Sequence, residues 1–153
     1  MLHIETPAKA TPVAIAMVDA ARAGGKDPLA PINQPYPQLI GAEIIEATPE
    51  RVVGRLTVRK ELCRSGGTMH GGAMMSFADM VASVGAFLNL PEGAATTTVE
   101  SKTNFLSAVK EGTVLKAEAT PLHSGRKTSV WQTRLIREDG KLAAVIMQTQ
   151  MVI

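Results

Sequence analysis

Residues 71–90 form the segment that most constrains the fold of this chain. They read GGAMMSFADMVASVGAFLNL and contain one ionisable side chain, Asp79. A helix over residues 71–89 would be apolar on nearly every face, so the rest of the chain must enclose it. Burying a lone carboxylate in such surroundings costs several kcal/mol unless something compensates. We therefore expect Asp79 to have either a partner or a chemical function.

Strand-like runs flank this segment on both sides. Two precede it, at residues 39–47 and 51–58, and four follow it, at residues 95–106, 113–123, 127–138 and 141–153. Turn residues separate the runs, and Asp139-Gly140 is a strong hairpin signal. This order of elements, two strands, one helix and four strands, predicts an α+β fold in which one antiparallel sheet curls around the central helix. Its outer face should carry the polar side chains of the strands, Lys116, Glu118, Gln132 and Arg134.

The first 37 residues differ in character from the rest. Thr11 is a suitable N-cap, Pro12 suits the first helical position, and Gly24-Gly25 ends the pattern, which predicts a short extra helix. Residues 26–37 are rich in proline and are expected to form an extended linker. The chain is thus divided into an N-terminal helix and linker at residues 1–37 and one domain at residues 38–153.

Composition excludes several classes of protein. The single cysteine, Cys63, excludes an internal disulfide and a cysteine metal cluster, and the histidines lack a ligand cluster, so we expect neither a metal nor a cofactor. The net charge of +2, the scattered basic residues and the 3% aromatic content disfavour nucleic-acid binding. The N-terminus lacks the pattern of a signal peptide, and no run is a confident membrane span, which predicts a cytoplasmic protein with no membrane partner.

The geometry of a helix relates Asp79 to its neighbours. Ser83 lies four residues further on and shares its face. Gly71 and Gly72 stand at the helix start, where backbone N–H groups are unpaired and a ligand carbonyl can approach. Asp79 is about 12 Å further along the axis. If Asp79 and the N–H groups at Gly71 both act on one ligand carbonyl, they should therefore come from two different subunits.

The stretch GTMHGGAMMSFADMVAS resembles the signature of the hotdog-fold acyl-CoA thioesterases. The closer similarity is to the branch that contains the phenylacetate-degradation and 4-hydroxybenzoyl-CoA thioesterases. The signature runs from Gly67 through His70, Gly71 and Gly72 to an acid seven residues later, here Asp79. The segments NFLSAVKEG, HSGRKT and EDGKLAA are also similar, so the resemblance covers residues 38–153. It implies a hotdog fold, with the curled sheet wrapped around the helix.

The resemblance also implies catalytic roles. Asp79 matches the carboxylate that acts as nucleophile or as general base, and the backbone N–H of Gly71 matches the oxyanion donor. Ser83 matches a hydroxyl that orients water in some members. Arg64 stands where many members carry Asn or Gln. A guanidinium only donates hydrogen bonds, so Arg64 is expected to donate to water, to the thioester oxygen or to Asp79.

Five further residues are implied on the binding side. His70 matches the residue that positions the turn rather than transferring protons, and Gly72 follows in that turn. Thr98 falls where other members carry Ser near the carboxylate. Arg126 and Lys127 fall where members contact the CoA nucleotide or pantetheine.

The predicted function is hydrolysis of an acyl- or aryl-CoA ester. From side-chain character alone, an apolar or aromatic acyl pocket is expected from Met74, Met75, Phe77 and Phe105. Two alternatives stay open: a non-catalytic acyl-CoA binding module, which Arg64 leaves possible, and an enoyl-CoA hydratase or dehydratase, which the missing HFPxxPxxPG pattern disfavours. Exposed edge strands predict a homo-oligomer. The resemblance implies a dimer or a homotetramer made of two dimers.

Overall fold

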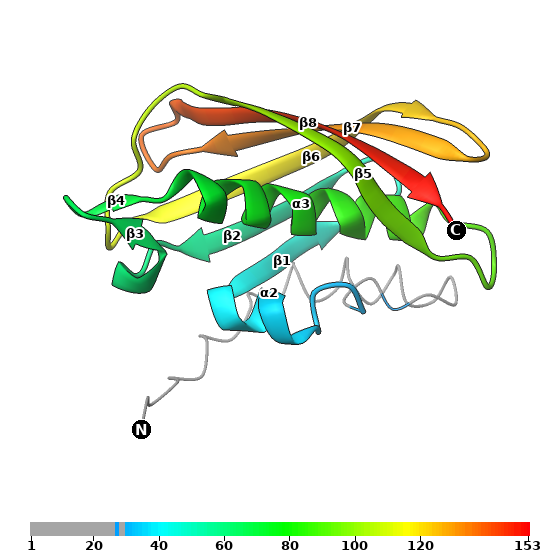
Figure 1. Cartoon of the computed structure of the whole chain (residues 1–153), viewed down its shortest axis with the longest axis horizontal. Helices are drawn as coiled ribbons and strands as arrows, with labels where there is room; N and C mark the ends of the chain where they lie inside the picture. The colour runs from blue at the N-terminus through cyan, green and yellow to red at the C-terminus, as the bar shows by residue number, and fades with distance from the viewer. Residues whose placement is uncertain (1–26, 28–29) are drawn as a thin grey trace.

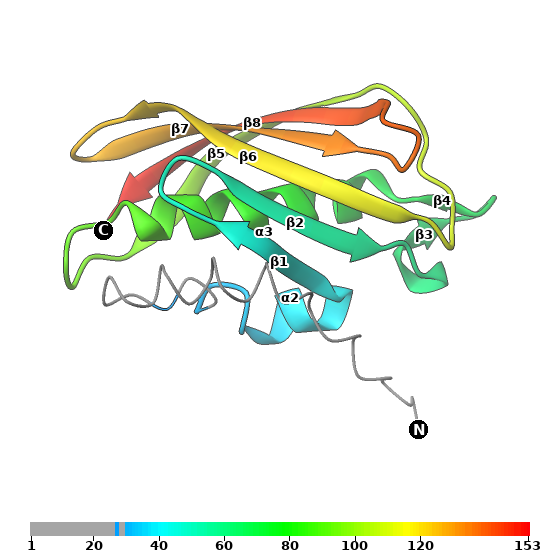
Figure 2. The same ribbon diagram turned by 180° about the vertical axis from the view of Figure 1, so that it is seen from behind.

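The apolar segment forms one long helix, α3 (Gly71–Leu88), within one residue of the predicted range. In this computed structural model, which describes residue 27 and residues 30–153, α3 packs against all six strands of one sheet. By length and composition alone α3 could cross a membrane. Here the sheet curls around it instead (Figures 1 and 2). Phe77, Val81 and Val84 of α3 are fully buried.

The strands form a single antiparallel sheet in the order β1-β2-β6-β7-β8-β5. The predicted α+β architecture, a curled sheet around a central helix, is confirmed. In the described residues β1 and β5 are the two edges of this sheet. The strands are β1 (Ala42–Ala47), β2 (Val52–Thr57), β5 (Thr96–Phe105), β6 (Val114–Ser124), β7 (Thr128–Ile136) and β8 (Leu142–Val152).

Alternation along the strands separates the two faces of the sheet. On β6, Leu115 and Ala117 are fully buried against α3, while Lys116 and Glu118 lie on the outer face. The predicted polar outer face is therefore confirmed. The turn at Gly140, with φ of 79°, joins β7 to β8 as the Asp-Gly signal predicts.

A glycine lets the helix approach the sheet closely at one point. A Cβ placed on Gly85 would lie 2.4 Å from the indole ring of Trp131, which is fully buried on β7. No side chain fits there without moving the indole. Helix and sheet are thus fixed in register around a tightly packed core.

Residues 35–40 correct the prediction of an extended linker running into a strand. They form a short helix, α2 (Pro35–Ile40), because Pro35 suits the first helical turn and Gly41 ends the helix at φ 77°. The hydroxyl of Tyr36 bonds that of Ser76 on α3 at 2.9 Å, which fixes α2 against the long helix. The predicted domain boundary at residue 37 falls inside α2, and the helix predicted after Thr11 lies outside the described residues.

The predicted loop at residues 60–70 also contains ordered structure. A 3-10 turn, η1 (Lys60–Leu62), is followed by a two-stranded ladder of β3 (Cys63–Arg64) and β4 (Thr68–Met69). The backbone N–H of His70 then donates to the carbonyl of Leu62 at 2.8 Å. This small hairpin sets the position at which α3 begins.

Candidate active site

Asp79 lies in the middle of α3 and is half-buried. Its Oδ1 accepts two hydrogen bonds, from the hydroxyl of Thr98 at 2.7 Å and from Nε2 of Gln148 at 2.5 Å. Its Oδ2 has no hydrogen-bond partner among the described residues. The acid therefore has partners on β5 and β8, and both of their hydrogen bonds go to the same carboxylate oxygen.

A second glutamine extends this network. Nε2 of Gln150 donates to the hydroxyl of Thr98 at 2.8 Å and, more weakly, to that of Ser83 at 3.5 Å. Its Oε1 accepts from Thr96 at 3.4 Å. Ser83 and Thr98, both predicted site residues, are thus brought together with Asp79.

Sequence reasoning missed Gln148 and Gln150. Both are almost completely buried, at 0% and 1% exposure, on the inner face of β8. The pattern MQTQ, which follows the inward-facing Ile146, places both on the same face of a strand. That alternation was the signal that could have identified them.

An open pocket of about 450 Å³ lies beside the network. It is lined on one side by Ser83, Thr98 and Gln150 and on another by Ala30 and Pro31. The residues before α2 therefore contribute a wall of a pocket that Ser83, Thr98 and Gln150 of the network also line. Within residue 27 and residues 30–153, no group of His, Cys, Asp and Glu could hold a metal ion.

The start of α3 is built around His70. Its Nδ1 accepts from the backbone N–H of Gly72 at 2.9 Å, so the histidine is the N-cap of the helix and its Nδ1 carries no proton. The N–H of Gly71 has no partner among the described residues. Phe105, at the end of β5, lies against Gly71, where an added Cβ would come within 3.0 Å of its ring. The turn thus presents one free backbone donor beside an aromatic ring.

The predicted site residues form three groups along α3. Arg64, His70, Gly71 and Gly72 lie at its first end, and Asp79, Ser83 and Thr98 lie at its middle. Arg64 is exposed on β3 and, in the described part of the chain, makes no hydrogen bond or ion pair with Asp79.

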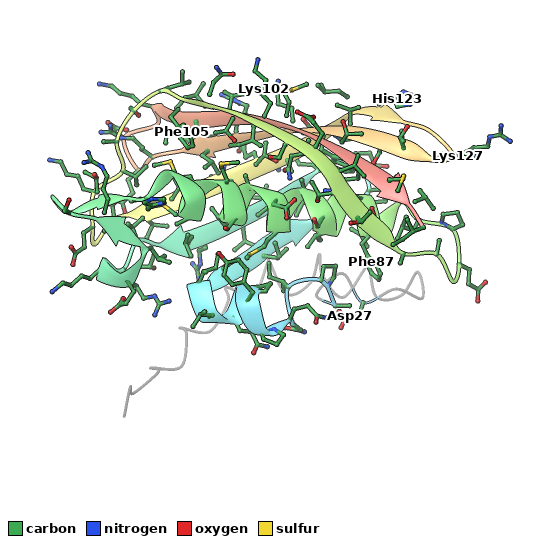
Figure 3. All side chains as sticks on the ribbon, viewed as in Figure 1. Asp27, Phe87, Lys102, Phe105, His123 and Lys127 are labelled. Atoms are coloured by element: carbon green, nitrogen blue, oxygen red, sulfur yellow. The ribbon has the colours of Figure 1, made fainter. Side chains whose placement is uncertain are left out.

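Arg126 and Lys127 lie at the other end, in the exposed turn between β6 and β7. Arg126 lines a second pocket, of about 270 Å³, together with Asn89 and Leu90 just past α3. Figure 3 shows Phe105 and Lys127 at opposite ends of the molecule. One chain therefore does not gather all the predicted residues into one place.

The prediction that Met74 and Phe77 line an apolar acyl pocket is wrong. Met74 and Phe77 belong to the core, at 4% and 0% exposure, because they face the sheet rather than the surface. Neither lines one of the two pockets described above. The pocket beside the network is lined instead by a mixture of polar residues, such as Ser83, Thr98 and Gln150, and small or apolar residues, such as Ala30, Pro31 and Phe87.

Comparison with known proteins identifies relatives. A family model described as the thioesterase superfamily matches residues 66–144. The chain is 38% identical over 118 residues to "Putative esterase ComA2" of Bacillus subtilis (strain 168), covering 76% of this chain and 92% of that protein. It is 29% identical over 108 residues to a 1,4-dihydroxy-2-naphthoyl-CoA hydrolase of Listeria monocytogenes, covering 71% and 87%. A thioesterase crystal structure from Haemophilus influenzae matches with a TM-score of 0.75 and 28% identity, covering 80% and 85%.

Proposed function

The chain belongs to the thioesterase superfamily and is a thioester hydrolase, and we propose that it cleaves an acyl- or aryl-CoA ester to the free acid and CoA with Asp79 as the catalytic carboxylate. The predicted hotdog fold and superfamily are confirmed. The observation that carries the proposal is the half-buried Asp79 carboxylate, which is bonded at Oδ1 and has no partner at Oδ2 within the described part of the chain. A relative named as a CoA hydrolase supports the substrate class.

The chemistry needs only one carboxylate because a thioester is already activated. As a general base, Oδ2 takes a proton from water while the water oxygen attacks the thioester carbonyl carbon. The C–S bond then breaks, and the proton passes to the departing thiolate of CoA. As a nucleophile, Oδ2 attacks the same carbon, the C–S bond breaks and the CoA thiolate leaves, which gives a mixed anhydride. Water then hydrolyses the anhydride to the free acid, regenerates the Asp79 carboxylate and supplies the proton that the thiolate takes up. Both routes develop negative charge on the carbonyl oxygen.

The free N–H of Gly71 at the start of α3 is suited to stabilise that charge. Gly71 is about 12 Å along the helix axis from Asp79, so one chain does not bring the two groups to one carbonyl. We infer that the glycine belongs to a second copy of the chain. The unpaired outer edge of β5 supports pairing of two copies, since it carries exposed Val99 and Phe105. The proposed assembly is a dimer or a pair of dimers.

The remaining predicted residues take supporting roles in this proposal. His70 and Gly72 fix the turn, and Ser83 orients water beside Oδ2. Arg64 lies at the same end of α3 as Gly71, where it can donate to a thioester oxygen held between subunits. Arg126 and Lys127 offer positive charge to the phosphates of CoA, which are remote from the thioester.

The experiment measures thiol release from a panel of short-chain, long-chain and aryl-CoA esters. Asp79→Asn is expected to lower kcat by about 10²–10⁴-fold on the best ester, because the base or nucleophile is lost. Glu92→Gln, which removes an exposed carboxylate in the loop after α3, is the matched control. Undiminished turnover by Asp79→Asn, with the fold intact by circular dichroism, would refute the assignment.

The same panel separates the two alternatives. An acyl-CoA binding module would bind an ester tightly and release no thiol. A hydratase would consume an enoyl-CoA and leave the thioester intact. Membership in the thioesterase superfamily favours hydrolysis over both.

A further inference from the structure

Gln148 has an unusual environment for an amide. Its side chain is fully buried, its Nε2 donates to Oδ1 of Asp79, and its Oε1 has no hydrogen-bond partner among residue 27 and residues 30–153. A buried carbonyl oxygen without a partner is destabilising, because it has lost its bonds to water. An apolar side chain of similar volume would fill the same space without that penalty. Packing therefore does not account for an amide here, and the bond to Asp79 does.

Gln150 acts on the same carboxylate through Thr98. A hydroxyl has one proton, and Oγ1 of Thr98 accepts from Nε2 of Gln150. The proton of Thr98 is therefore free to point at Oδ1 of Asp79, as the 2.7 Å contact shows. Gln150 thus sets the direction of the second bond to the acid, and such chains of hydrogen bonds strengthen one another.

The direct hydrogen bond from Gln148 and the relayed one from Gln150 through Thr98 both end on the same carboxylate oxygen. Direct donation by Gln148 and relayed donation by Gln150 fix the rotation of the Asp79 side chain while leaving Oδ2 unpartnered among the described residues. A carboxylate held at one oxygen presents the other in a single direction. Fixing a reacting group in this way can contribute on the order of 10²-fold to rate.

We propose that Gln148 and Gln150 are positioning residues that hold Oδ1 of Asp79 and so define Oδ2 as the reacting oxygen. The inference rests on the proposed catalytic role of Asp79. It adds two residues that the resemblance did not supply, and it assigns different tasks to the two oxygens of the acid.

The test replaces Gln148 by Met, which has a similar volume and no amide. We expect kcat to fall by roughly 10–100-fold with KM within about twofold, because the loss is in orientation rather than in ester binding. The melting temperature should change little, because removing the unsatisfied carbonyl oxygen of Gln148 is opposed by the loss of one donor to Oδ1 of Asp79. A residue with a merely structural role would lower kcat only together with the melting temperature.

Thr133→Val is the matched control. Thr133 is fully buried on the same inner face, its hydroxyl is also unsatisfied, and it makes no hydrogen bond to Asp79. This change alters interior polarity without touching the network, so kcat should stay at the wild-type value.

A second set of variants tests the relayed hydrogen bond from Gln150. Thr98→Val and Gln150→Met should each lower kcat, while Thr98→Ser, which keeps the hydroxyl, should restore it. These variants decide the question even where Gln148→Met does not fold.

Three outcomes would overturn the proposal. The first is a wild-type kcat in both Gln148→Met and Gln150→Met. The second is a loss of kcat that occurs only in proportion to a loss of melting temperature. The third is a loss of kcat in Thr133→Val as large as that in the glutamine variants. Asp79→Asn separates the two hypotheses. If it retains turnover, the proposed function fails. If it loses turnover while both glutamine variants keep theirs, the positioning role alone fails.

Discussion

The two oxygens of Asp79 differ in their surroundings, and this difference explains how an acid is kept in an apolar helix. Oδ1 receives two donors from the sheet, which offset part of the penalty of burial. Oδ2 keeps its lone pairs for an external group. A purely structural acid would be expected to have both oxygens bonded.

Cys63 gives a prediction that bears on the activity assay. Burial, with the negative charges of Glu111 and Glu61 added, raises the pKa of its thiol, and Sγ donates to the carbonyl of Arg59 at 3.4 Å. Because the thiolate is the reactive form, native protein should react slowly with a disulfide reagent at neutral pH. Cys63→Ser should leave kcat unchanged. A rapid, stoichiometric reaction before substrate is added would contradict this.

The sequence predicted part of the Asp79 environment. Thr98 and Ser83 were expected near the acid, and the network contains both. Gln148 and Gln150 were not, because Gln148 is 69 residues from Asp79 in the chain. Only the pairing of β8 with β5 and β7 brings it under the helix. Such a contact depends on strand order, which local patterns do not specify.

At the scale of elements, the capping of α3 by His70 gives the next prediction. His70→Ala should lower the free energy of unfolding by about 1 kcal/mol, as loss of an N-cap does, and should lower kcat because the turn at Gly71 loosens. His70→Asn offers another capping acceptor and should recover both, measured by urea unfolding and thiol release. Recovery of stability without any recovery of kcat would indicate instead that His70 transfers protons.

The outer face of the sheet predicts a dependence of stability on pH. A hydrogen bond from Lys116, with its charge and that of Arg51, holds the pKa of Glu118 below its usual value of 4.5. The folded state therefore stays ionised to lower pH than the unfolded state. The stabilisation is present above about pH 4.5 and is lost as the pH falls through the lowered pKa.

Glu118→Gln should therefore be less stable than wild type at neutral pH, and the difference should shrink as the pH falls below about 4.5. Urea midpoints across this range measure the effect. Glu92→Gln, at an exposed loop position, should show a much smaller change. A constant difference between Glu118→Gln and wild type at every pH would contradict the ion-pair explanation.

Elements with strong periodicity were predictable, and those set by special residues were less so. The apolar run of α3 and the alternation of β6 and β7 fixed those elements closely. Helix α2 was missed because Pro35 and Pro37 suggest extended chain, whereas here they occupy its first turn. The β3–β4 ladder was missed because two-residue strands have no readable period.

At the scale of the whole molecule, the proposed site consists of two groups of residues at different places along α3. Asp79 and its network are complete within one chain, while the free N–H of Gly71 and exposed Arg64 stand at the first end of α3. The unpaired edge of β5 offers a surface for a second copy. Sequence patterns predict that an edge exists, but they do not specify what lies against it.

Two variants isolate the two halves of the proposed site. Asp79→Asn removes the carboxylate chemistry. Gly71→Pro removes the backbone donor, and proline is accepted at the first helical position after His70, whose φ of −69° and ψ of 139° suit a residue before proline. Gly71→Ala, which keeps the N–H, is the control for the added bulk beside Phe105. Asp79→Asn and Gly71→Pro should each be nearly inactive alone.

The most direct measurement is the activity of hybrids of these two variants, co-expressed with different tags and purified through both. In a site shared between subunits, one of the two sites of a hybrid dimer has both wild-type groups, so kcat should recover to about half of the wild-type value. In a site within one chain, every site of the hybrid carries one defect. A hybrid no more active than its parent variants would contradict the account.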